Sequence, residues 1–79
     1  MKEIKVGTTV EYRGCFGMFD PTLVKVKAIY RSEYKRCKYA DEEVDSVSFD
    51  EREYCIFILD DGHWCYGEQI VSVGRQKID

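Results

Sequence analysis

The feature that most constrains the fold is an unbroken run of six apolar and aromatic residues, 54–59, followed closely by an Asp61-Gly62 pair. Gly accepts a positive φ and Asp tolerates one, so Asp-Gly between two apolar segments is typical of a β-hairpin. The short segment 64–66 supplies the second arm. The first arm is apolar on both faces, which suits a central strand that is covered on both sides. We therefore expect the chain to be organised around this hairpin.

The register of the hairpin has two solutions, and the sequence leaves both open. A two-residue turn places Phe57 on the same face as Trp64, whereas a three-residue turn places Ile56 and Ile58 there. A shift of the pairing register by one residue therefore moves the side chains that faced the core to the opposite face of the strand. We expect a core built from Val10, Val24, Val26, Ala28, Ile56, Phe57, Ile58 and Trp64.

Two other segments alternate between apolar and polar residues, as half-buried antiparallel strands do. In residues 8–13, Val10 and Tyr12 share one face. In residues 22–31 the lysines share the predicted outer face. The side chains expected on the inner face of this second segment are Val24, Val26, Ala28 and Tyr30.

Residues 32–53 are the least regular part of the sequence. Basic residues come first and acidic residues last, which is unfavourable for a helix because its amino end is positive and its carboxyl end negative. A structureless connection of this length is unusual in a compact domain. We therefore expect an extended β-ribbon, in which 34–39 continue the preceding strand and Val44, Val47 and Phe49 alternate on its return.

The order of these segments resembles that of SH3-like barrels, particularly those of the Tudor type. In that family the first strand follows a Val-Gly turn, here Val6-Gly7, and an Asp-Gly hairpin precedes a short helical turn, here 68–70. The resemblance covers 6–30 and 54–73 and leaves out the ribbon. It implies an all-β fold in one domain, 1–79: a small SH3-like barrel of five or six mostly antiparallel strands with an extended β-ribbon insertion.

A second resemblance concerns the phrase Gly62-His63-Trp64-Cys65-Tyr66. It is similar to a Gly-His-Trp-x-Tyr phrase in small bacterial proteins carried on prophages and mobile elements. Tudor domains that bind methylated ligands place aromatic residues at the end of the first strand and beside the Asp-Gly turn. Tyr12 and either Trp64 or Tyr66 match such places, although a complete aromatic cage is not matched residue by residue.

Composition narrows the class of protein further. Hydrophobic residues make up 44% and aromatic residues 14% of the 79 residues, which argues against disorder. The net charge of −3 disfavours sequence-independent binding of nucleic acid, because such binding depends on neutralising phosphates. No segment reaches transmembrane length, and no apolar signal segment follows Met1. We therefore expect a cytoplasmic protein with reduced thiols and no contact with a membrane.

The sequence shows no arrangement typical of metal binding or catalysis. The four cysteines lack Cys-x-x-Cys spacing, and His63 with Cys65 is the nearest approach to a ligand pair. His63 is the only histidine, and it is badly placed to activate Cys65 because residues two apart on a strand lie about 7 Å apart at the backbone. Asp60-Asp61 before Gly is ordinary turn chemistry. We expect no enzymatic activity, no metal and no cofactor.

Binding is the function that remains, and the first site we expect is for a protein or peptide. It lies where the loop 15–21 approaches the turn 60–64, with rings as an apolar floor and carboxylates as negative charge. Its residues are Tyr12, Phe16, Phe19, Asp60, Asp61, Trp64 and Tyr66. The alternative is that Phe16, Phe19 and Trp64 are all buried and close the end of the barrel.

The second candidate is a nucleic-acid site on the basic part of the ribbon. There, cations could follow a phosphate backbone and tyrosine rings could stack on bases, although the acidic block that follows opposes this. The residues of this site are Arg31, Tyr34, Lys35, Arg36, Lys38 and Tyr39.

Overall fold

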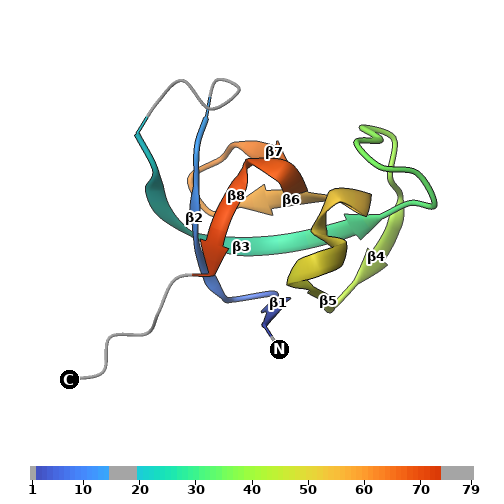
Figure 1. The fold of residues 1–79 in the computed structure, drawn as a ribbon, viewed down its shortest axis with the longest axis horizontal. Coiled ribbons are helices and arrows are strands. Elements are labelled where there is room, and N and C mark those ends of the chain that lie inside the picture. The colour runs from blue at the N-terminus through green and yellow to red at the C-terminus, as the bar shows by residue number, and fades with distance from the viewer. Residues whose placement is uncertain (1, 15–19, 74–79) are drawn as a thin grey trace.

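The computed structural model describes residues 2–14 and 20–73, and within them the chain is built mainly of short strands (Figure 1). These strands are β1 (Glu3–Lys5), β2 (Thr9–Tyr12), β3 (Thr22–Arg31), β4 (Glu42–Val44), β5 (Ser46–Ser48), β6 (Cys55–Leu59), β7 (Trp64–Tyr66) and β8 (Ile70–Val73). The helical elements of the described residues are two 3-10 helices, η2 (Phe49–Tyr54) and η3 (Gly67–Gln69).

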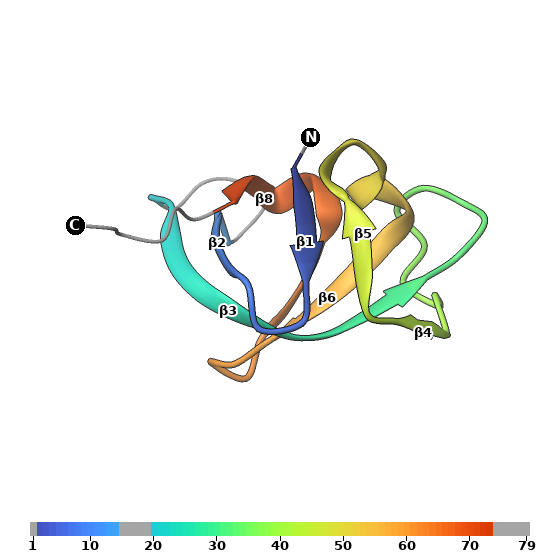
Figure 2. The same ribbon diagram turned by 90° about the horizontal axis from the view of Figure 1, so that it is seen from below.

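The main sheet has the strand order β7-β6-β3-β2-β8, and β4 joins it by pairing with β3. β1 and β5 form a separate two-stranded ladder, and Figure 2 shows them side by side. All pairings between the described strands are antiparallel. The predicted all-β, antiparallel fold is therefore confirmed, whereas the SH3-like type of barrel stays a prediction.

A bulge in β3, the long strand that the others share, reverses the expected side-chain directions. Val24 and Val26 are buried as predicted, but the pairing with β6 shifts register between Val26 and Ala28. Beyond this shift Ile29 is fully buried, whereas Ala28 and Tyr30 are half-buried on the opposite face. The expectation that Ala28 and Tyr30 face the core is therefore wrong, because one extra residue inverts the alternation that follows it.

The β6–β7 hairpin adopts the three-residue turn. Ile58 pairs with Trp64, and the Leu59 N–H donates to the carbonyl of His63 at 2.8 Å, which leaves 60–62 as the turn. Phe57 consequently points into the core, where it is fully buried.

The opposite face of the hairpin carries three residues that we expected in the core. Ile56 and Ile58 are half-buried, and Trp64 is exposed over 49% of its surface. The assignment of these three side chains to the core is therefore wrong. Only one face of β6 packs into the interior, so the apolar residues of its other face lie on the outside of the sheet.

The segment between β3 and β4 also differs from the prediction. β4, which ends at Val44, returns along β3 as expected, but 34–39 form no strand. Val47 lies on β5, which pairs with β1, and Phe49 begins η2, so the expected alternation of these residues on one returning strand is wrong. The Ser32 side chain makes a local turn, accepting from the Tyr34 N–H at 2.9 Å and donating to its carbonyl at 2.8 Å. Such turns compete with strand pairing. The Arg36 N–H then donates to the carbonyl of Glu53 at 2.9 Å, so the loop folds back onto η2 instead of forming a ribbon.

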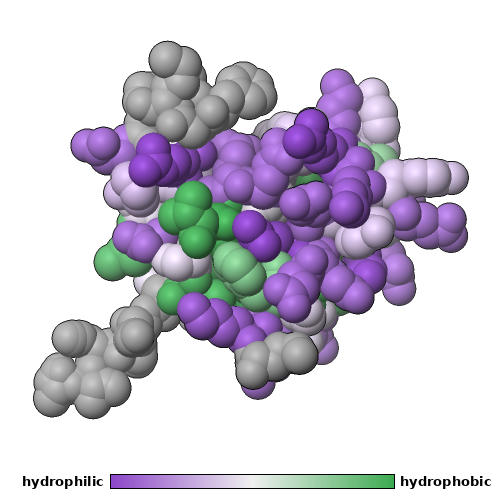
Figure 3. All heavy atoms as spheres, viewed as in Figure 1, coloured by the Kyte–Doolittle hydropathy of each residue, from purple (hydrophilic) through white to green (hydrophobic). Residues whose placement is uncertain are grey.

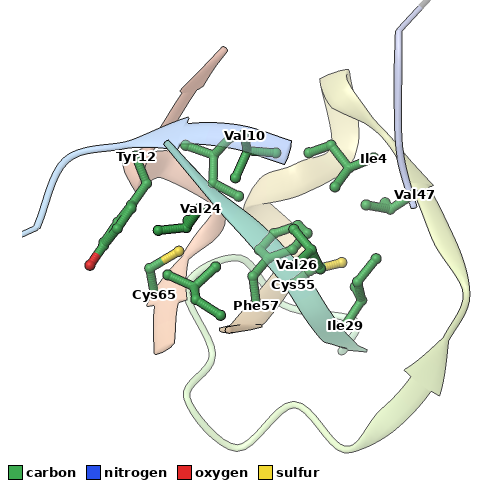
Figure 4. Packing of buried hydrophobic residues seen from close by; sticks show 12 residues of the cluster. Ile4, Val10, Tyr12, Val24, Val26, Ile29, Val47, Cys55, Phe57 and Cys65 are labelled. Carbon is green, nitrogen blue, oxygen red and sulfur yellow. The ribbon is translucent and has the colours of Figure 1, made fainter. Parts of the chain in front are cut away.

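The core is formed by one face of the main sheet together with the β1–β5 ladder (Figure 4). Phe57 and Ile29 are its largest central side chains, and Ile4 and Val47 connect the small ladder to it. The buried hydrophobic residues are Ile4, Val10, Tyr12, Val24, Val26, Ile29, Ala40, Val47, Cys55, Phe57, Leu59, Cys65 and Ile70.

The two 3-10 helices pack together and close the structure beside β8. Arg52 of η2 donates from Nε to the carbonyl of Ile70 and from Nη1 to that of Phe49, both at 3.0 Å. Its guanidinium also lies over the Phe49 ring, 3.9 Å from the ring centre. Gly67 of η3 is buried against the backbone of Arg52, so close that a side chain has no room there.

Candidate functional site

The outer face of β3, β6 and β7 presents two parallel rows of apolar and aromatic side chains, which we call the aromatic face. The first row is Tyr30, Ile56 and Tyr66, and the second is Ala28, Ile58 and Trp64; each row is a set of directly paired residues. All except Trp64 are half-buried. Paired residues on neighbouring strands have Cβ atoms about 5 Å apart, so these six side chains form one continuous surface.

Trp64 is the most exposed member of the aromatic face. Its ring packs edge-on against Tyr66, with ring centres 5.2 Å apart and planes at 78°. This arrangement follows from β7, because residues two apart on a strand point to the same side. The contact covers only part of the indole, which keeps 49% of its surface in water. A large exposed ring that belongs to an apolar surface is typical of an interaction site.

The structure brings together only some of the residues predicted for the peptide site. Trp64 and Tyr66 meet on the aromatic face. Tyr12 instead packs in the core beside Cys65, with its hydroxyl pointing out of the cluster (Figure 4). Phe16 and Phe19 lie outside the described residues. The alternative in which Trp64 is buried to close the barrel is wrong, since about half of the indole is exposed.

The two aspartates of the turn serve mainly to build it. Asp60 accepts from the Lys25 N–H at 3.3 Å, and Asp61 accepts from the His63 N–H at 3.0 Å. The hydrogen bond from the His63 backbone is the main cause that lowers the pKa of Asp61. Burial, followed by the nearby Asp61 carboxylate, raises the pKa of Tyr12. Asp61 thus connects the turn to the end of β2, although on the side away from the aromatic face.

The basic residues of the predicted nucleic-acid site are largely matched by acids of η2 and η3. Arg31 donates to Glu51 at 2.9 Å, Lys35 lies 3.6 Å from Glu53, and Arg36 pairs with Glu68. This pairing lowers the positive potential that a phosphate backbone would meet.

The tyrosines of the same segment remain accessible. Tyr34 and Tyr39 are exposed over 70% and 77% of their surfaces, and Lys38 lies over the Tyr39 ring. Neither belongs to the aromatic face, whose residues are all on β3, β6 and β7.

A second apolar patch lies over β8 and is surrounded by hydrophilic side chains (Figure 3). Val71 on β8 is exposed by 42%, and Leu23 on β3 by 62%. Glu11 lies on β2, between these two strands, and accepts a hydrogen bond of 2.6 Å from the hydroxyl of Ser72 on β8. Among the described residues, the exposed apolar side chains of this patch include no aromatic ring, so the aromatic face is the stronger candidate.

The thiols of Cys55 and Cys65 are buried and free, and that of Cys37 is free and half-buried. Burial raises the pKa of Cys55 to about 11 and that of Cys65 to about 12. His63 lies outside and contacts Asp61 at 3.3 Å, so it does not activate Cys65. Within residues 2–14 and 20–73, no group of three His, Cys, Asp or Glu side chains is placed to hold a metal ion.

These thiols predict a loss of stability in alkaline solution. The thiols ionise near pH 9 in the unfolded chain but only near pH 11–12 in the folded protein. The stability that the protonated thiols contribute is therefore complete below pH 9. As the pH rises from about 9 to the pKa of the folded protein, each thiol lowers the free energy of unfolding by about 1.4 kcal/mol per pH unit. Urea unfolding between pH 7 and about 11 measures the loss, and Cys65→Ala should flatten the curve. Equal slopes for the wild type and Cys65→Ala would contradict this explanation.

None of the helices in the described part of the chain is long and apolar enough to cross a bilayer. Comparison with protein-family models, with curated proteins and with solved structures finds no match. The geometry of the aromatic face is therefore the basis for the function proposed below.

Proposed function

We propose that this chain is a small non-enzymatic binding module that recognises a protein or peptide through the aromatic face. The single observation that carries the proposal is the half-exposed indole of Trp64 at the end of a continuous row with Ile58 and Ala28. Covering a large apolar side chain contributes about 1.5–3 kcal/mol. Tryptophan and tyrosine are also the residues that most often dominate the binding energy of an interface.

The proposed scaffold for this module is an SH3-like barrel. Three features support it. The Val6-Gly7 segment precedes β2, and Gly7 has a φ of 95°. β2 pairs with both β3 and β8, so the last strand returns to the first strand of the main sheet. η3 forms a single turn between β7 and β8, where the family has its short helical turn.

An open sheet face suits a polypeptide better than a small ligand. The two rows are two residues apart along each of the three strands. An extended segment that binds over them places every second side chain on one face, so its side chains have the same spacing as the rows. A small molecule is instead usually bound in a concave site that covers most of its surface. The proposed ligand is accordingly a segment with apolar side chains on one face.

A nucleic-acid ligand is the weaker proposal for the same chain. Its support is the exposure of Tyr34 and Tyr39, since exposed aromatic rings can stack on bases. Against it stand the ion pairs of Arg31, Lys35 and Arg36 with acids of the same molecule. A titration with single-stranded oligo-dT tests this proposal: binding at low salt that falls steeply with added salt would favour the basic segment over the aromatic face.

Selection from a random phage-displayed peptide library tests the protein or peptide proposal. Peptides enriched on the wild type should bind Trp64→Ser at least about tenfold more weakly, because a large part of the buried surface is lost. Trp64 is the only tryptophan, so its fluorescence should shift to shorter wavelength when a synthetic copy of an enriched peptide binds.

Tyr39→Ser is the matched control for this selection. It also removes an exposed ring, but one that lies outside the aromatic face. Enriched peptides should bind Tyr39→Ser as they bind the wild type. Failure to enrich any peptide, or enrichment that is unchanged by Trp64→Ser, would overturn the proposal.

A further inference from the structure

The aromatic face carries opposite charges at its two ends. Lys27 is the exposed extra residue of the β3 bulge and directly precedes Ala28 in the second row. Glu43 on β4 is exposed and pairs with Tyr30 at the end of the first row. Neither Lys27 nor Glu43 forms an ion pair with another described residue. Both charges therefore lie on the β3 side of the apolar rows, and along the strand direction the cation marks the end beside the second row and the anion the end beside the first.

A surface of this kind is complementary to itself. A two-fold axis that lies between two facing copies and runs parallel to the rows exchanges the first row with the second, so that the lysine end of one copy meets the acidic end of the other. The same operation brings the apolar rows together, and the exposed indole of each copy can be covered by the isoleucines of its partner. A purely basic or purely acidic peptide would instead meet a like charge at one end, which disfavours it.

We propose that the occupant of the aromatic face is a second copy of this chain, so that the protein forms a two-fold symmetric dimer through β3, β6 and β7. This inference rests on the proposed function, since it names the partner of the same surface. A standard interface involves roughly 20–30 residues a side, and the aromatic face with its charged ends provides far fewer. The dimer is consequently weak and depends on protein concentration.

Sedimentation equilibrium from micromolar to millimolar concentration measures the association. The wild type should change from monomer to dimer over this range, and the Trp64 emission should shift to shorter wavelength in parallel. Trp64→Ser should weaken the dimer at least about tenfold, as truncation of a tryptophan that is buried in an interface does.

Charge exchange at the two ends provides the sharper test. Lys27→Glu makes both ends acidic and Glu43→Lys makes both basic, so each single variant should weaken the dimer about tenfold through like-charge contacts. The double variant Lys27→Glu/Glu43→Lys restores one charge of each sign and should dimerise nearly as well as the wild type. Surface changes of this kind rarely alter stability by more than about 0.5 kcal/mol, so all three proteins should fold.

Lys38→Glu is the matched control, because it changes the net charge as Lys27→Glu does but lies in the loop beside Tyr39. It should leave the dimer unchanged. A wild type that stays monomeric at millimolar concentration overturns the dimer. So does a dimer that is insensitive to Trp64→Ser, or a double variant that is no better than the single ones. If the chain stays monomeric while Trp64-dependent peptides are still enriched from the library, the dimer fails and the proposed function stands.

Discussion

Replacing Phe57 with Ala should lower the free energy of unfolding by about 3–5 kcal/mol, as truncation of a buried aromatic residue does. Phe57 is fully buried at the centre of β6 and pairs with Ile29 of β3 and Cys65 of β7. A small domain has a total stability of roughly 5–15 kcal/mol, so this loss removes a large share of it. Urea unfolding followed by circular dichroism measures the change.

Ile58→Ala is the comparison for this variant, because Ile58 is the next residue of the same strand but lies half-buried on the aromatic face. Its truncation should cost less than about 2 kcal/mol, since only part of the side chain leaves water on folding. Equal losses for Phe57→Ala and Ile58→Ala would mean that both faces of β6 are buried, and the aromatic face would not be an open surface.

Gly67→Ala should be the most destabilising of the single-methyl changes at glycine. A Cβ at Gly67 would lie 1.7 Å from the carbonyl oxygen of Arg52 and 2.3 Å from its carbonyl carbon. Both atoms belong to the backbone, so no side-chain rotation relieves the clash and η2 and η3 must separate. Overpacking of this kind costs typically about 1–3 kcal/mol and occasionally more, and we expect the upper part of that range.

Gly62→Ala provides a control with a different physical cause. Gly62 has a φ of 91° but open space around its Cβ position, so Ala is strained there without a steric clash. Such strain costs about 1–2 kcal/mol. Thermal melts of both variants should therefore place Gly67→Ala below Gly62→Ala. The reverse order would show that η2 and η3 can separate at little cost in free energy, so that their contact contributes little to the stability of the fold.

Local chemistry accounts for the parts of the fold that were predicted correctly. The Asp61-Gly62 pair produced the β6–β7 turn, and Gly62 has the positive φ that the pair implied. The alternation of 9–12 placed Val10 and Tyr12 on one face, and the expected burial of Val10 is confirmed, whereas Tyr12 had been assigned to the peptide site. The helical turn before the last strand is η3. These features depend on the conformational preferences of a few adjacent residues, so they can be recognised without knowledge of the partner strands.

The direction of the second half of β3 depended on a partner 30 residues away. After Val26 the sequence offers apolar residues on both faces, with Ala28 and Tyr30 on one and Ile29 on the other. Either alternation is acceptable locally. Pairing with β6 introduces the bulge and buries Ile29, which fills more of the core than Ala28 and contains no hydroxyl that needs a partner.

The loop between β3 and β4 was mispredicted for a similar reason. Its charge order correctly excluded a helix, but the sequence does not state which groups the loop will contact. Its partners are the carbonyl of Glu53 and the carboxylates of Glu53 and Glu68, which lie beyond β5 in the sequence. The strand predicted for 34–39 would have needed a neighbouring edge, and Ser32 and η2 satisfied the polar groups instead.

Whether the face that carries the candidate site is buried or exposed also depends on the tertiary structure. The sequence identified Trp64 and Tyr66 as a pair on one face, because residues two apart on a strand always share a side. It could not assign that face to the core or to solvent, since a turn of two or three residues satisfies Asp-Gly equally well. The tertiary structure selects the three-residue turn, which buries Phe57 and Leu59 with Cys65 and leaves the indole outside. Because side chains alternate with a period of two, that one-residue choice of register converts a predicted core residue into the most exposed ring of the sheet.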